Sequence, residues 1–185
     1  MFERITPHSC YNKSVNKLII ICGLSFAGKS TLGDAVSNKF GFKTVDVDST
    51  KFSMFGDVKD DDLKKEDWIK IYDTTDKEIA DILQSGKNVV DASRNFRKAE
   101  RDKIRGTVKN LGYAVVTIYI DTPVEIARKR WLANRTSRLR RDIVDKDFEE
   151  IINAMEPPTE DENALVMHYD ENITDWISMR SMVLS

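Results

Sequence analysis

The chain has 185 residues, which corresponds to about one domain and is long enough to bury a hydrophobic core. Apolar residues make up 41% and charged residues 32%, which indicates a globular protein and excludes a disordered one. The formal net charge of −2 provides no overall basic field, so we expect no membrane partner, and a nucleic-acid partner only through a local basic segment. The two cysteines fit a reducing compartment and no signal peptide is recognisable, so we expect a cytoplasmic location.

The first segment of the chain, residues 1–16, is polar and has no periodicity. We expect it to form an N-terminal arm in front of a single domain over residues 17–185. The domain begins with the run LIIIC at 18–22, whose apolar residues are continuous rather than alternating. This pattern is typical of a strand that is buried on both faces of a parallel sheet.

The rest of the chain alternates helices with strands. Up to residue 91 the pattern predicts, in order, a helix at 29–40, a strand at 42–48, a loop at 49–62, a long helix that ends before Gly86, and a strand at 88–91. It then predicts a helix that ends before Gly112, a strand at 113–121, a helix from 122 to about 134, a basic loop, a helix at 144–155 stopped by prolines, a strand at 164–169 and a helix at about 174–183. This alternation predicts an open, doubly wound α/β sheet, in which ligands lie at the carboxyl ends of the strands.

Directly after the first strand, residues 23–31 form a Walker A motif, G-x-x-x-x-G-K-[ST]. Its backbone N–H groups and the following helix N-terminus predict a phosphate site for ATP, in which Lys29 reaches the β and γ phosphates and Ser30 ligates Mg²⁺. A chance glycine-rich turn is the alternative, which the flanking strand and helix disfavour. The residues expected to bind the nucleotide are Gly23, Leu24, Ser25, Phe26, Ala27, Gly28, Lys29, Ser30 and Thr31.

Four segments together resemble the P-loop kinase superfamily that includes polynucleotide 5′-hydroxyl kinases, zeta-toxin-type kinases and AAA-type kinases. They are the Walker A motif, the segment VDVDSTK at 45–51, the segment at 88–104, and the segment from 119 through a basic loop to EPPTEDE at 156–162. The motifs N-K-x-D and D-x-x-G, typical of GTPases, are absent. The resemblance implies a three-layer α/β/α fold with a five-stranded parallel sheet in the order 2-3-1-4-5, and an arginine-rich lid at about 135–143.

The resemblance also implies the activity, an ATP- and Mg²⁺-dependent transfer of the γ-phosphoryl group to a hydroxyl acceptor. The acceptor is expected to be a small molecule or a nucleoside or nucleotide. A polynucleotide 5′-hydroxyl kinase is one alternative, favoured by the basic loop and disfavoured by the net charge. A nucleotide-binding switch without an acceptor is the other alternative.

Two residues at the predicted end of the second strand are candidates for the acceptor side. Asp48 is expected to accept the proton of the attacking hydroxyl or to hold a magnesium-bound water, the alternative being a helix cap or a turn residue. Asp46, on the same face of that strand, is a weaker candidate. Lys51 stands where the family has an arginine that binds the acceptor's phosphate, and it is otherwise a solvated surface lysine.

The third strand ends in Asp91, which resembles a metal-orienting Walker B carboxylate and is otherwise a strand-end turn residue. Asn95 matches a family asparagine that contacts the substrate, or it caps the next helix.

Cations are concentrated between residues 128 and 141, namely Arg128, Lys129, Arg130, Arg135, Arg138, Arg140 and Arg141. Such a run is usually a solvated face, but a lid arginine can neutralise the transferring phosphoryl group. By family position Arg135 is the first candidate for this catalytic role and Arg130 the second, and Arg138 is expected to contact ATP. Trp131 lies nearby and is expected to pack in the core.

Overall fold

The computed structural model describes residues 15–140 and 142–185, so nearly all of the expected arm at 1–16 lies outside the described residues. The chain forms a five-stranded parallel sheet in the order β2-β3-β1-β4-β5, as the resemblance implied. The strands are β1 (Lys17–Cys22), β2 (Lys43–Val45), β3 (Val89–Asp91), β4 (Ala114–Asp121) and β5 (Leu165–His168). The helices are α1 (Lys29–Phe40), α2 (Val47–Phe55), α3 (Lys65–Gln84), α4 (Lys98–Asn110), α5 (Val124–Ser137), α6 (Asp145–Ala154), α7 (Ile173–Met179) and α8 (Ser181–Leu184), with short 3₁₀ helices η1 (Asp60–Asp62) and η2 (Glu160–Glu162).

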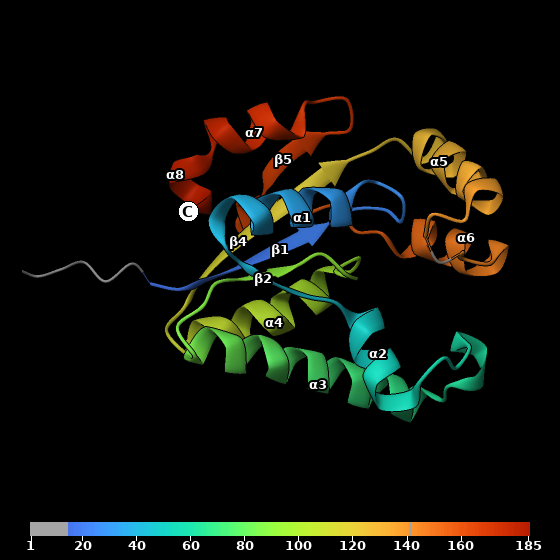
Figure 1. The fold of residues 1–185 in the computed structure, drawn as a ribbon, viewed down its shortest axis with the longest axis horizontal. Coiled ribbons are helices and arrows are strands. Elements are labelled where there is room, and N and C mark those ends of the chain that lie inside the picture. Colours follow the sequence, from blue (N-terminus) through green and yellow to red (C-terminus); the bar gives the residue numbers. More distant parts are fainter. Residues whose placement is uncertain (1–14, 141) are drawn as a thin grey trace, which may run out of the picture.

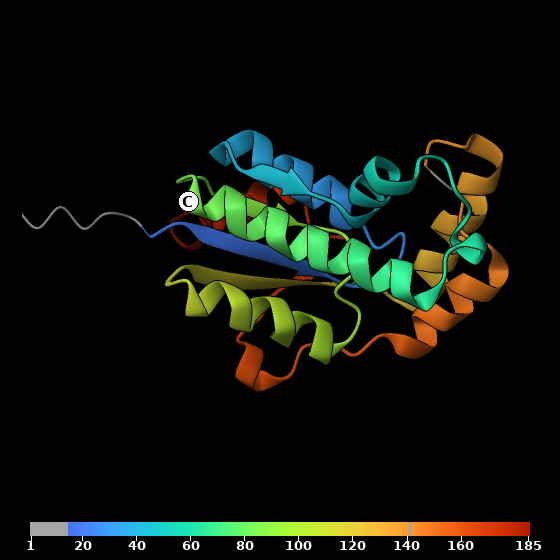
Figure 2. The same ribbon diagram turned by 90° about the horizontal axis from the view of Figure 1, so that it is seen from below.

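Helices cover both faces of the sheet, with α1 and α7 on one side and α3 and α4 on the other (Figures 1 and 2). The central strand β1 shows why its sequence is apolar throughout. Ile19 and Ile21 pack into the cluster under α1 and α7, whereas Leu18 and Ile20 pack into the cluster under α3 and α4. Burial of both faces removes the alternation that a half-exposed strand would have.

The segment after β2 differs from the sequence prediction. The predicted strand at 42–48 is only three residues long, and the predicted loop at 49–62 contains α2 and η1. Asp46 ends the extended segment because its carboxylate accepts a hydrogen bond from the backbone N–H of Ser49, at 3.1 Å, and so caps α2. Asp46 and Asp48 therefore do not share a strand face, and Asp48 lies in the first turn of α2.

The predicted helix from 122 to about 134 also differs in its end. It continues as α5 to Ser137, so the connection to α6 consists of residues 138–144. Among the described residues, no helix combines the length and the apolar character that crossing a membrane requires.

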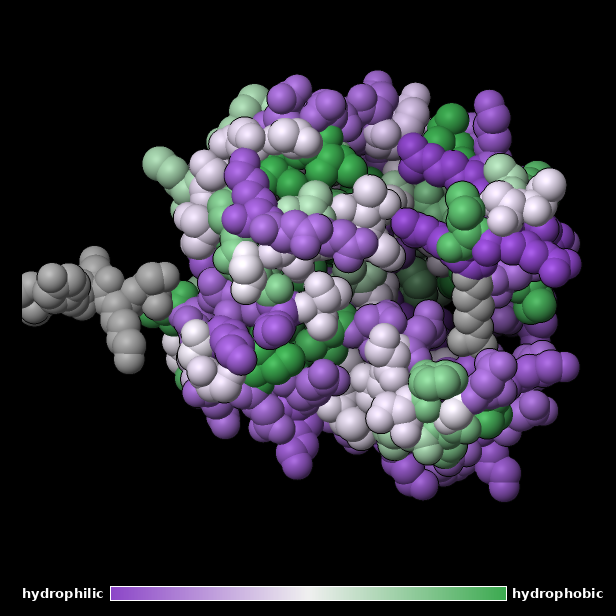
Figure 3. All heavy atoms as spheres, viewed as in Figure 1, coloured by the Kyte–Doolittle hydropathy of each residue, from purple (hydrophilic) through white to green (hydrophobic). Residues whose placement is uncertain are grey.

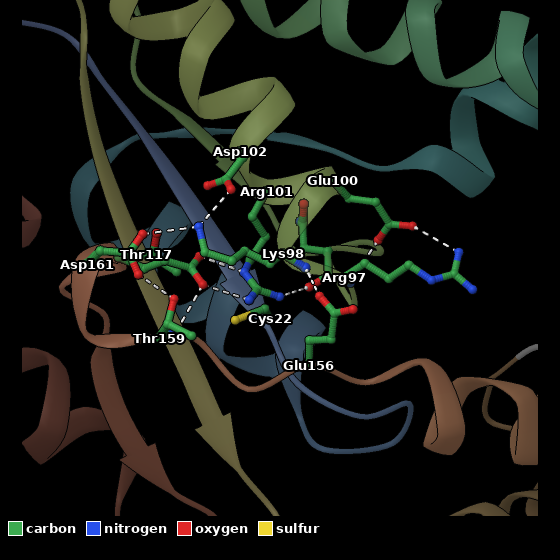
Figure 4. Close-up of polar contacts among 12 residues, drawn as sticks. Cys22, Arg97, Lys98, Glu100, Arg101, Asp102, Thr117, Glu156, Thr159 and Asp161 are labelled. Atoms are coloured by element: carbon green, nitrogen blue, oxygen red, sulfur yellow. Dashed lines mark hydrogen bonds and ion pairs between the residues drawn. The ribbon is translucent and has the colours of Figure 1, made fainter.

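A buried ion pair joins the segment after β3 to the segment before β5 (Figure 4). The guanidinium of Arg101 donates from Nε and Nη2 to the two carboxylate oxygens of Glu162, at 2.8 Å each, and neither side chain is exposed. Its Nη1 donates to the backbone carbonyls of Asn95 and Phe96, at 3.0 and 3.1 Å. Arg105 donates to the same carboxylate at 2.7 Å. These bonds satisfy both buried charges and fix the path of the loop at 95–96.

The Pro-Pro segment is tied to the same loop by a second set of contacts. The carboxylate of Glu156 accepts from the backbone N–H of Lys98 at 2.7 Å, and the N–H of Glu156 donates to the carbonyl of Phe96 at 2.9 Å. Two of the segments that carried the family resemblance are therefore in direct contact, and they hold the start of α4 in place.

Removal of the carboxylate by Glu162→Ala leaves Arg101 buried without its counter-ion, so we expect the free energy of unfolding to fall by about 3–5 kcal/mol. Burial alone would raise the pKa of Glu162, but the hydrogen bonds from Arg101 and Arg105 outweigh it and lower this pKa from 4.5 to about 2. Because the folded pKa lies below the unfolded one, this stabilisation is complete above pH 4.5 and is lost as the pH falls toward 2.

Urea unfolding at pH 7 and at pH 3.5 measures this effect, with Glu160→Ala, an exposed position of the same short helix, as the matched control. Equal stability of the two variants at pH 7 would contradict the assigned role of the ion pair.

Candidate active site

The Walker A loop connects β1 to α1 at the carboxyl end of the sheet. Its first glycine, Gly23, has a φ of +142°, and a Cβ at this position would lie 2.8 Å from the carbonyl oxygen of Ile120. Gly28 precedes α1 with a φ of +114°. Both positions require glycine, so the sequence motif reflects the backbone conformation that exposes N–H groups to a phosphate.

Lys29 is folded back onto its own loop. Its Nζ donates to the carbonyl oxygens of Gly23 and Leu24, at 3.0 Å each, and lies 5.2 Å from the centre of the Phe96 ring. Burial lowers the pKa of Lys29 from 10.5 to about 8. The ammonium is thus held by two carbonyl dipoles. A bound phosphate would stabilise the charged form of Lys29, which burial disfavours.

The first turn of α1 presents two exposed hydroxyls, those of Ser30 and Thr31. Arg140, from the α5–α6 connection, donates to the Thr31 hydroxyl at 3.1 Å. The basic connection therefore reaches the Walker A helix through Arg140.

Asp91 ends β3 next to β1 and is buried. Burial raises its pKa, whereas hydrogen bonds from Ser93 and Asn95 oppose the rise. The Asn95 side chain donates to the Asp91 carboxylate at 2.9 Å. Asn95 has a φ of +63° and lies before the cap of α4, so it orients Asp91 and does not cap the helix. Among the described residues, no cluster of three or more His, Cys, Asp or Glu side chains is placed to hold a metal ion.

A cavity of about 430 Å³ lies on the β5 side of the Walker A loop, between α5 and the segment after β5. Arg130, Arg140 and Tyr169 are among the residues that line it. Arg130 donates to the carbonyl of Ala27 at 2.9 Å and to that of Phe26 at 3.3 Å. Arg130 therefore supports the Walker A loop directly and faces the cavity beside it.

A second cavity, of about 360 Å³, lies along α2. Asp48 is exposed and lines it, together with Asp46 and Asp57. Lys51 also lines it, but its side chain is buried and forms an ion pair with Asp60, so it is not the solvated surface lysine of the alternative interpretation. Because β2 ends in register with Asp91, α2 begins at the sheet edge where the Walker A loop lies. The space-filling view shows a hollow on this side, between α2 and the α5–α6 pair (Figure 3).

The other two lid arginines named from the sequence are placed differently. Arg135 forms ion pairs with Asp142 and Asp145, and its guanidinium lies 4.2 Å from the centre of the Trp131 ring. Arg138 is exposed, caps the end of α5 and is not among the residues that line the first cavity. Arg135 thus braces the α5–α6 connection, and its catalytic role stays a prediction.

The α5–α6 connection is held at both ends. The Trp131 and Phe148 rings stack with centres 4.2 Å apart and planes 7° apart, and both side chains are buried, so the expected core position of Trp131 is confirmed. The buried side chain of Asn134 donates to the carbonyl of Arg140 at 3.0 Å and accepts from its N–H at 2.9 Å. The helices α5 and α6 therefore present residues 138–140 in a defined position.

Sequence reasoning missed Arg94, which stacks on Trp68 and Tyr72 of α3. Arg94 stands between Asp91 and Asn95 in a segment that carried the resemblance, so the sequence alone places it near the predicted site. Its aromatic partners lie near the start of α3, more than 20 residues earlier in the sequence, and no local pattern connects them with Arg94.

The lowered pKa of Lys29 generates a prediction for nucleotide binding. A triphosphate favours the charged ammonium, so binding requires uptake of a proton above pH 8, and we expect affinity for ATP to fall by up to about tenfold per pH unit above that value. Isothermal titration calorimetry at pH 7.5, 8.5 and 9.5 measures the slope. Lys29→Gln is expected to bind weakly at every pH and to show no slope, and a wild-type affinity that is constant across this range would contradict the assignment.

The fold is shared with known proteins. The family model described as an AAA domain matches residues 18–158. A relative from Schizosaccharomyces pombe, described as a probable gluconokinase, is 23% identical over 176 residues, which cover 91% of this chain and 87% of the relative. Among solved structures, a gluconokinase from Sinorhizobium meliloti 1021 superposes with a TM-score of 0.63 at 15% identity, covering 92% of this chain and 91% of that chain. The Mycobacterium tuberculosis APS kinase in complex with AMPPNP and APS gives a TM-score of 0.67 at 17% identity, covering 92% and 99%. Because the family match spans most of the domain, the chain belongs to the AAA domain family, as a P-loop kinase.

Proposed function

We propose that the protein transfers the γ-phosphoryl group of ATP to a hydroxyl group of a small-molecule acceptor. The observation that carries this proposal is the presence of two separate cavities at one sheet edge, one beside the Walker A loop and one along α2. A nucleotide switch needs only the first of them. A phosphotransferase needs both, because donor and acceptor must be bound together for an in-line transfer.

The donor side is supported by the geometry of the Walker A loop. Backbone N–H groups of residues 23–28 and the charged form of Lys29 would hold the β and γ phosphates. Arg140 and Arg130 approach the loop from the α5 side, so they are better placed than Arg135 to neutralise charge on the phosphates. Residues 138–144 would serve as the lid over the nucleotide.

The residues present fit a magnesium ion. The exposed hydroxyl of Ser30 and the buried carboxylate of Asp91 are oxygen donors of the kind that Mg²⁺ prefers, and Mg²⁺ usually takes its other ligands from water and substrate phosphates. When bound, the ion would neutralise phosphate charge. Asn95 keeps the Asp91 carboxylate oriented for this task through its hydrogen bond.

The acceptor side centres on Asp48. Its position in the first turn of α2, exposed at the wall of the second cavity, suits a base that accepts the proton of the attacking hydroxyl. The volume of about 360 Å³ suits a metabolite, and the names of the relatives favour a sugar acid or a nucleotide derivative.

A polynucleotide acceptor is less well supported. The carboxylates of Asp46, Asp48 and Asp57 line the second cavity, and this charge disfavours a long polyanion. Two arginines of α5 are already paired with carboxylates, Arg128 with Glu149 and Arg135 with Asp145. The basic segment is therefore only in part available for a phosphate backbone.

Asp48→Asn tests the proposal. We expect the rate of transfer to fall by about 10²–10⁴-fold, because the amide cannot accept the proton, while the affinity for ATP stays near that of the wild type. Single-turnover transfer from labelled ATP to a metabolite extract, with mass spectrometry of the products, measures the rate, and calorimetry measures ATP binding. Asp34→Asn, an exposed carboxylate on α1, is the matched control.

Three results would count against the proposal. Wild-type transfer by Asp48→Asn would exclude Asp48 as the base. ATP hydrolysis that no hydroxyl compound accelerates would favour the switch, and transfer confined to a 5′-hydroxyl oligonucleotide would favour the polynucleotide kinase.

A further inference from the structure

The side chain of Arg94 lies on an aromatic surface of α3, which also contacts Lys51, a residue that lines the second cavity. Its guanidinium carbon is 4.7 Å from the centre of the Trp68 ring and 4.8 Å from that of Tyr72. The two rings are themselves stacked, with centres 5.8 Å apart and planes 26° apart. Stacking of this kind fixes the plane of a guanidinium and leaves its N–H groups free to point along that plane.

The cation is half-buried and has no hydrogen-bonding partner among the described residues. Within residues 15–140 and 142–185, the guanidinium of Arg94 donates no hydrogen bond and forms no ion pair. Burial lowers its pKa, and more distant carboxylates, including those of Glu100 and Asp48, oppose this effect. The hydroxyl of Tyr72 is also buried without a hydrogen-bond partner. Unsatisfied buried donors are costly, so such a group usually has a partner in the functional state.

Arg94 lies in the loop after β3, between Asp91 and Phe96. Two residues after it, Phe96 contacts the ammonium of Lys29 in the Walker A loop. The charges of Asp48 in α2 and Asp60 in η1 also act on its guanidinium. A group bound to Arg94 therefore lies close to the point at which phosphate and hydroxyl must meet.

The lysine expected to bind the acceptor is already occupied. Lys51 is buried in an ion pair with Asp60, and its Nζ lies 6.0 Å from the centre of the same Trp68 ring. The Lys51 ammonium is thus already bound to a carboxylate, whereas the Arg94 guanidinium has no hydrogen bond or ion pair with a described residue.

We propose that Arg94 binds an oxyanion of the acceptor, so that the substrates of this enzyme are anionic hydroxyl compounds that carry a carboxylate or a phosphate or sulfate group. This inference rests on the proposed phosphotransferase function. A planar guanidinium binds such groups through two parallel N–H···O bonds, which also fix the orientation of the acceptor. The aromatic stack would hold Arg94 ready for this contact before the acceptor arrives.

Matched pairs of acceptors test the inference, because each pair differs only in the anionic group. Gluconate and glucitol form the carboxylate pair, and AMP and adenosine form the phosphate pair. For an anionic compound that the enzyme phosphorylates, we expect Arg94→Gln to raise the KM of that compound by about tenfold or more, because hydrogen bonds to a charged group are lost. Arg94→Lys is expected to restore part of the affinity, and Arg97→Gln, an exposed arginine three positions away, to match the wild type.

A second measurement does not depend on turnover. Trp68 reports on the site by its fluorescence, since Trp131 and Trp176 are buried elsewhere. We expect gluconate, AMP or inorganic phosphate to change this fluorescence in the wild type but not in Arg94→Gln, and Trp68→Phe to lose the signal. If an anion binds but no phosphoryl group is transferred to any hydroxyl compound, the proposed function is wrong and the anion site is retained.

The inference is overturned by any of four results. The wild type uses or binds the neutral member of each pair as well as the anionic one. Arg94→Gln keeps the KM of the wild type for the anionic acceptor. No anion among the three changes the fluorescence of Trp68. A change in thermal stability alone, with both KM and binding unchanged in Arg94→Gln, assigns Arg94 a structural role and also overturns it.

Discussion

The geometry of the site depends on one buried ion pair, between Arg101 and Glu162. The same guanidinium that pairs with Glu162 also binds the carbonyls of Asn95 and Phe96, so one side chain connects the start of α4, the loop after β3 and the segment before β5. The loop held in this way carries Asn95, which orients Asp91, and Phe96, which contacts Lys29. This charge pair thereby helps to set the positions of Asp91 and Lys29, the residues proposed to hold the metal ion and the phosphates.

The two sides of the cleft differ in charge, and this difference follows from the connections at the carboxyl ends of the strands. The start of α1, α5 and the α5–α6 connection contribute cations, Lys29, Arg130 and Arg140 among them. The start of α2 and its cap contribute carboxylates, Asp48 and Asp46. Arg94 is a cation on the acidic side, supported by aromatic rings rather than by a carboxylate. This distribution of charge favours a highly charged phosphate donor on the side of the Walker A loop. It favours a small acceptor, bound through one charged group, on the side of α2.

The elements that were predicted correctly are those whose signal is local. The continuous apolar run of β1, the Walker A motif and the glycine after α1 each fix a short segment by themselves, and the resemblance supplied the strand order. The β2 segment was predicted wrongly because VDVD alternates like a strand, while its first aspartate caps a helix through Ser49. Asn95 was expected to contact the substrate or to cap a helix, and neither its hydrogen bond to Asp91 nor the stacking of Arg94 on α3 could be predicted, since both depend on tertiary contacts. Residues that act through tertiary partners leave little trace in a single sequence.

The Trp131–Phe148 stack has a consequence for how the sequence can vary. It joins α5 to the first turn of α6 inside the core, whereas residues 138–140 of the connection are exposed and contribute little to the core. Lengthening such a loop costs chain entropy that grows only slowly, about 0.6 kcal/mol for each doubling of its length. Insertions there would leave the fold intact while they change which cation reaches Thr31, the present contact of Arg140. The contact with Thr31 can therefore change during evolution while the domain keeps its stability.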